Sequence, residues 1–93
     1  MDFDAYTYYT IEATTTTYDR ATGKYNEGKP ATIAKFDSYQ EAYTRLIKEV
    51  ADFLYTHIES VVGIMKEDGI GISYDQDGPV PKYQFFTATK HKS

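Results

Sequence analysis

A proline-free amphipathic stretch, Ser38 to Asp68, constrains the fold of this chain more than any other feature of the sequence. Ser38 and Glu41 have capping-box spacing, in which the serine side chain accepts from the backbone N–H three residues later and the glutamate reaches back to the serine N–H. Gly69 suits the left-handed position that often follows a last helical turn. We therefore predict one long helix from Ser38 to Asp68, with Gly63 as the point where it can bend or break.

Wound at ~100° per residue, this stretch presents an apolar face that suits packing on a sheet. That face consists of Tyr43, Ile47, Val50, Ala51, Leu54, Ile58, Val61, Val62 and Met65. A second apolar stripe flanks it, formed by Tyr39, Leu46, Phe53, His57 and Ile64. Two interpretations of this stripe stay open: a loop or the N-terminal segment covers it, or it contacts a partner, most simply the same helix of a second copy. A helix of ~45 Å is longer than strands of ordinary length can cover, which favours the partner.

Period-two alternation with many threonines and tyrosines predicts strands on both sides of the helix. The predicted strands span residues 3–18, 31–36, 70–74 and 82–89, and residues 90–93 are predicted to form a short basic tail. Turn chemistry with Gly23 links the first two strands, and Tyr25 is expected still to pair with the first. Glycine in the third strand predicts a bulge or the close approach of another backbone.

The predicted fold class is α+β in the order ββαββ. A four-stranded, mainly antiparallel sheet carries one long helix packed on one face, and residues 1–93 form a single small domain. The strand order between the two hairpins stays open. The opposite sheet face is predicted to carry Tyr6, Tyr8 and Tyr18 as candidate contact residues.

Three interpretations of this tyrosine face are considered. It is a solvated tyrosine–threonine face, a docking surface for another protein, or a platform on which bases of a single-stranded nucleic acid stack. Stacking would need a basic rim, for which the candidates are Arg20, Lys24, Lys29, Lys82, Lys90 and Lys92. The net charge of −4 and the acids Asp4 and Glu12 argue against general nucleic-acid binding.

The residues also argue against several chemistries. The chain has no cysteine, which excludes disulfides, thiolate catalysis and cysteine-bound zinc. It contains neither a G-x-S-x-G motif nor a Walker loop. The segment 75–78 resembles part of a calcium loop, but Pro79 follows and the later ligands of such a loop are missing. His57 is interpreted as a packing or interface residue, and His91 lies in the predicted tail. We expect no enzymatic activity, no metal and no cofactor.

The N-terminus is acidic, unlike a signal peptide, and no run of eighteen apolar residues could span a membrane. We therefore expect a cytoplasmic protein with no membrane partner. The functional hypothesis is a small non-enzymatic protein-binding module, an inhibitor or adaptor of the kind that phages and other mobile elements encode. It would act by covering a partner's surface, with homodimerisation through the helix stripe as a linked prediction. The alternative is a single-stranded nucleic-acid-binding protein that uses the aromatic sheet face.

Overall fold

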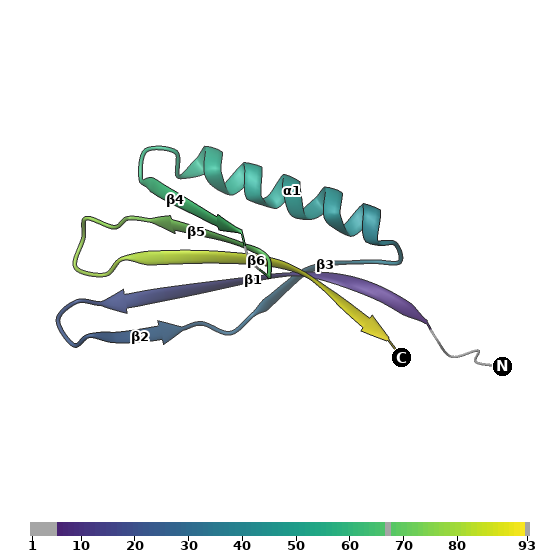
Figure 1. Cartoon of the computed structure of the whole chain (residues 1–93), viewed down its shortest axis with the longest axis horizontal. Helices are drawn as coiled ribbons and strands as arrows, with labels where there is room; N and C mark the ends of the chain where they lie inside the picture. The colour runs from purple at the N-terminus through teal and green to yellow at the C-terminus, as the bar shows by residue number, and fades with distance from the viewer. Residues whose placement is uncertain (1–5, 67, 93) are drawn as a thin grey trace.

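The computed structural model describes residues 6–66 and 68–92 as one helix and a twisted antiparallel sheet (Figure 1). The elements in chain order are β1 (Thr7–Asp19), β2 (Lys24–Glu27), β3 (Ala31–Phe36), α1 (Tyr39–Thr56), β4 (Val61–Lys66), β5 (Ile70–Tyr74) and β6 (Lys82–Lys92). The α+β class and the single helix packed on a mainly antiparallel sheet are confirmed. The order ββαββ with four strands is wrong, because the sheet has six strands.

The helix begins where the capping pattern predicts and ends much earlier than expected. Ser38 is the N-cap, and its Oγ accepts from the backbone N–H of Glu41 at 3.1 Å. The Glu41 carboxylate accepts in turn from the Ser38 hydroxyl at 3.2 Å. At the other end, His57 donates its backbone N–H to the Phe53 carbonyl and a turn of residues 57–60 follows.

The prediction of a helix to Asp68 is therefore wrong, since Val61–Lys66 form strand β4. This segment is rich in β-branched residues and contains Gly63, a poor helix former. Its backbone pairs with β5, from Val61 opposite Tyr74 to Lys66 opposite Ile70, with a bulge between Val61 and Gly63. Strand pairing therefore satisfies the backbone groups that continued helix would have satisfied internally.

Strands β1 and β6 form the long centre of the sheet. They pair without a register break from Thr7 opposite Lys92 to Thr17 opposite Lys82. The prediction that residues 90–92 form a tail is wrong, because the first residues of β1 provide partners for them. Residues 3–5 of the predicted first strand lie outside the described residues. Ser93, the last residue of the predicted tail, also lies outside them.

The far edge of β1 is paired by two short strands in succession. The second half of β1 pairs with β2, and the first half pairs with β3. Tyr25 lies opposite Tyr18, which confirms the expectation that it pairs with the first strand. Residues 28–30 interrupt the pairing, where Pro30 lacks a backbone donor. On the other side of β6 the order continues with β5 and then β4.

The core lies between α1 and one face of this sheet. Its buried members are Ile11, Ala42, Leu46, Val50, Ile72 and Phe86. The face of α1 predicted to lie on the sheet is thus rotated: Leu46 from the flanking stripe is 5% exposed, whereas Tyr43 and Ile47 are 40% and 43% exposed. Once residues 57–66 leave the helix, the centre of its apolar arc moves toward Leu46 and Phe53, because several members of the predicted face belonged to the lost segment.

The glycine of the third predicted strand, Gly71, is approached closely by a side chain and not, as predicted, by another backbone. A Cβ added to Gly71 would lie 2.8 Å from Cε1 of Phe85, so the Phe85 ring occupies the space above this residue. Gly23 in the first turn has a φ of 70°, the left-handed conformation that a side chain disfavours.

Candidate functional site

The sheet face that α1 leaves uncovered is the most distinctive surface of the molecule. Tyr9, Ile11 and Ala13 pack toward the core, so alternation places the even-numbered residues of β1 on the opposite, open face. Paired residues of antiparallel strands share a face. The open face therefore carries Tyr6, Tyr8, Thr10, Glu12, Thr14, Thr16, Tyr18, Tyr25, Lys35, Tyr83, Phe85, Thr87, Thr89 and His91.

One end of the open face holds a stacked group, here termed the Tyr8 cluster and defined as Tyr6, Tyr8, Lys35 and His91. The Tyr8 ring stacks on His91 with centroids 4.8 Å apart and on Tyr6 at 5.5 Å. Lys35 Nζ lies 4.3 Å from the Tyr8 centroid and 5.7 Å from that of Tyr6. A cation over aromatic faces is attracted by the ring quadrupole. The cluster combines flat apolar surface with one positive charge.

Polar contacts hold the Tyr8 cluster in place. The Thr10 Oγ1 atom lies 2.7 Å from His91 Nε2 and donates to Glu12 at 3.0 Å, and Glu12 Oε2 is 4.0 Å from the same imidazole nitrogen. The Tyr6 hydroxyl donates to the Asp37 carboxylate, which raises the pKa of Tyr6. Side chains from β1, β3, β6 and the segment before α1 therefore hold the rings in place.

The three predicted contact tyrosines share this face but do not form one site. The Tyr18 ring packs against Tyr25 at the β2 end of the sheet, in a tilted arrangement with centroids 4.7 Å apart. It is ten residues from Tyr8 along β1, which corresponds to roughly 33 Å of strand. The structure thus brings Tyr6 and Tyr8 together and separates them from Tyr18.

The predicted interface stripe on the helix does not exist as one surface. Leu46 is buried in the core, and the Phe53 ring packs 5.0 Å from Tyr74 and 5.8 Å from Phe86. His57 is half-buried and stacks on Phe53 at 4.1 Å. Tyr39 is 56% exposed on α1, whereas Ile64 lies on β4 and is 59% exposed. The five residues therefore do not form one continuous stripe on α1.

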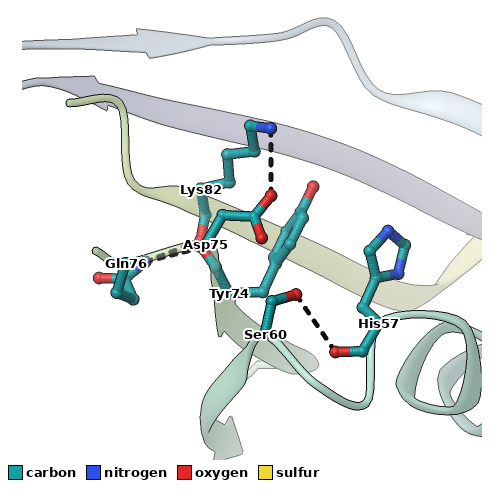
Figure 2. A network of polar contacts seen from close by, with 6 residues as sticks. All are labelled: His57, Ser60, Tyr74, Asp75, Gln76 and Lys82. Atoms are coloured by element: carbon teal, nitrogen blue, oxygen red, sulfur yellow. Dashed lines mark hydrogen bonds and ion pairs between the residues drawn. The ribbon is translucent and has the colours of Figure 1, made fainter. Parts of the chain in front are cut away.

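A polar network closes the other end of the molecule, where α1, β4 and the β5–β6 connection meet (Figure 2). Lys82 Nζ donates to Asp75 Oδ2 at 3.2 Å, and the Asp75 N–H donates to the Ser60 carbonyl. The hydrogen bond from Lys82, together with one from Ser60, lowers the pKa of Asp75. Gln76 Nε2 donates to the carbonyls of Tyr74 and Lys82. Burial raises the pKa of Tyr74.

Serine, histidine and aspartate gather in this network without the contacts of a catalytic triad. The Ser60 hydroxyl donates to the His57 main-chain carbonyl at 3.2 Å (Figure 2). His57 Nδ1 lies 3.1 Å from the Phe53 carbonyl oxygen. A triad instead requires a hydrogen bond from the nucleophile to the imidazole. Among the described residues no group of three or more His, Cys, Asp or Glu side chains could hold a metal ion. The network serves to anchor the turn after α1 to the β5–β6 connection.

The basic rim proposed for nucleic-acid stacking is not arranged around the open face. Lys90 pairs with Tyr9 and Lys92 with Thr7, so both lie on the helix side of the sheet. Lys82 forms an ion pair with Asp75, and Arg20 donates to the carbonyls of Gln76 and Gly78.

Two residues of the Tyr8 cluster were missed by sequence reasoning. Lys35 lies in the predicted strand 31–36 without a predicted site role, and His91 lies in the predicted tail. Strand β6 continues to Lys92, and extending the period-two count of residues 82–89 places His91 on the same face as Phe85 and Thr87. The sequence carries no apolar residue after Ala88 that would have indicated this extension.

Within residues 6–66 and 68–92, no helix has the length and apolarity needed to cross a membrane. No family model matches the chain, and neither the curated proteins nor the solved structures give a significant match.

Proposed function

We propose that this chain is a non-enzymatic protein-binding module whose contact surface is the open sheet face, centred on the Tyr8 cluster. One observation carries the proposal. Three rings and a lysine are stacked and hydrogen-bonded on the face of the sheet that α1 does not cover. Fixed tyrosines supply contact area at low entropic cost, and aromatic residues are enriched where proteins bind each other.

The charge distribution favours a protein partner over a nucleic acid. Apart from Lys35 and His91, the open-face residues named above are uncharged or acidic, and the net charge of the chain is −4. Phosphate backbones require several clustered cations for useful affinity. A module of this size would act by covering a partner's surface, as an inhibitor or adaptor does.

The direct test is affinity capture of partners from extracts of the source cells, quantified by mass spectrometry. The bait is the native chain, Tyr8→Ser, Lys35→Glu or the control Tyr55→Ser. Tyr55 is a useful control because it is 84% exposed and lies on α1, away from the open face. We expect a protein retained by the native chain and by Tyr55→Ser, and depleted at least tenfold with the two cluster variants.

Each variant is first checked by circular dichroism and urea unfolding, so that loss of capture is not loss of fold. Equal retention of every captured protein by Tyr8→Ser and the native chain would exclude the Tyr8 cluster as the contact surface. Anisotropy titration with a fluorescent single-stranded oligonucleotide separates the alternative function. Saturable binding that weakens steeply with salt and is lost in Tyr8→Ser would favour nucleic acid instead.

A further inference from the structure

The last part of β6 has an unpaired edge. Strand β6 pairs with β1 along its whole length, but β5 pairs only with residues 82–86 of its other side. No other described strand or backbone hydrogen bond occupies that side of residues 87–92. Such an edge presents alternating N–H and C=O groups in the geometry that an additional strand satisfies.

A groove adjoins the beginning of this edge. It has a volume of about 300 Å³, and it lies between α1, the β4–β5 turn and β6. The groove is lined by Tyr43 and Ile47 of α1, by Ala88 of β6 and by Gly69 in the β4–β5 turn. Gly69 fits tightly there, because a Cβ on it would lie 2.6 Å from the Phe86 carbonyl oxygen. The turn thus blocks the edge up to Phe86 and leaves the backbone beyond it open.

The charges around the groove indicate which kind of ligand it favours. Lys66 lines it, and Lys90 and Lys92 lie on the helix side of the open edge, whereas Asp68 is the described acid in the lining. Among the described residues the lysines there outnumber the acids, in a chain whose net charge is −4. A second copy fits poorly, because antiparallel pairing of two β6 edges would bring their lysines together, and like charges across strands are destabilising.

We propose that this groove binds an extended acidic peptide by strand addition to residues 87–92 of β6. The peptide backbone pairs with the free edge, one of its apolar side chains enters the groove against Tyr43 and Ile47, and its carboxylates approach Lys66 and Lys90. This is the recognition mode in which main-chain hydrogen bonds provide affinity and side-chain pockets provide specificity. The groove lies on the helix side of the sheet, and the strand edge shares only His91 with the Tyr8 cluster. The inference therefore does not rest on the function proposed above.

The test is an NMR titration of the isotope-labelled native chain with a capped six-residue peptide of alternating aspartate and valine. We expect saturable shifts centred on the amides of residues 87–92 and on Ile47, with slowed hydrogen exchange of the edge amides. Lysine in place of aspartate should weaken binding at least tenfold. Methylation of every second backbone nitrogen of the peptide removes the N–H groups on one side of its strand. Of the two alternating methylation patterns, the one that removes the N–H groups facing β6 should abolish binding.

Variants test the same point from the protein side. Ile47→Asp should weaken binding at least tenfold, whereas Tyr55→Asp on the same helix should leave it unchanged; both residues are exposed enough to tolerate the change. Lys90→Glu should shift the preference toward the lysine peptide, with Lys48→Glu as the control on an exposed helical position. Tyr8→Ser should retain binding.

Three outcomes would overturn the proposal. The first is the absence of saturable shifts in residues 87–92 at millimolar peptide. The second is a set of shifts centred on β4, which would place strand addition at the other edge of this region. The third is equal affinity for the aspartate and lysine peptides, which would remove the charge selection.

Discussion

The two faces of the sheet are stabilised in different ways, although neighbouring residues of the same strands form them. Toward α1 the sheet presents Ile11, Ile72 and Phe86, all at most 5% exposed. On the other face the same strands carry tyrosine, threonine, lysine and histidine, arranged in stacked and hydrogen-bonded groups. The apolar face is organised by burial, and the open face is organised by contacts between amphipathic side chains. Substitutions at adjacent positions of one strand should therefore change the free energy of unfolding by different amounts.

The sharpest form of this comparison uses Phe85 and Phe86. Phe86 is 5% exposed and belongs to the core, whereas Phe85 is 37% exposed on the open face above Gly71. Phe86→Ala should cost about 3–5 kcal/mol of unfolding free energy because it leaves a cavity. Phe85→Ala should cost about 1–2 kcal/mol, in proportion to its partial burial. Urea unfolding measures both. Equal losses would mean that the open face is covered in solution.

The rotation of the helix can be tested in the same way at Leu46 and Ile47. Leu46→Ala should cost about 2–4 kcal/mol, since this side chain is buried against the sheet. Ile47→Ala should cost about 1 kcal/mol or less, because Ile47 is 43% exposed. Thermal or urea unfolding of the two variants gives the ranking. The reverse ranking would restore the helix orientation that periodicity alone predicts.

A smaller effect on stability is expected at the start of α1, the helix that covers the apolar face of the sheet. Ser38→Ala removes the oxygen that accepts from the Glu41 N–H and should cost about 1 kcal/mol. Ser38→Asp keeps an acceptor at the same place and should restore most of the loss. Urea unfolding midpoints compare the three proteins. An unchanged midpoint in Ser38→Ala would show that packing alone fixes this end of α1.

The smallest effect is the pH dependence of stability that arises from Asp75, in the connection between β5 and β6. The pKa of Asp75 is lower when folded than its unfolded value of about 3.9. Its stabilisation is therefore fully present above pH ~4 and is lost as pH falls through the folded pKa. Asp75→Asn removes this dependence while keeping a residue that tolerates the φ of 51°. The difference in urea midpoint between native and variant should shrink from pH 7 to pH 2. A constant difference would contradict the ion pair with Lys82.

Local signals predicted the elements whose partners lie nearby in the sequence. Residues 31–36 and 70–74 form strands with the bounds expected from alternation, and Ser38 caps the helix as its pattern indicates. The placement of Tyr6, Tyr8 and Tyr18 on one strand face also follows from period two. Each of these features depends on the conformation of a few adjacent residues, which side-chain chemistry determines directly.

The tertiary structure decided the features that depend on distant partners. The segment 61–66 has apolar residues at spacings that suit both a helix and a strand, and pairing with β5 selected the strand. Residues 90–92 became part of β6 because β1 extends far enough to pair with them, which placed His91 on Tyr8. The sequence by itself determined where turns, caps and alternation occur. Pairing between segments up to 85 residues apart decided which apolar stretch became strand, which helical side became core, and which rings met on the open face.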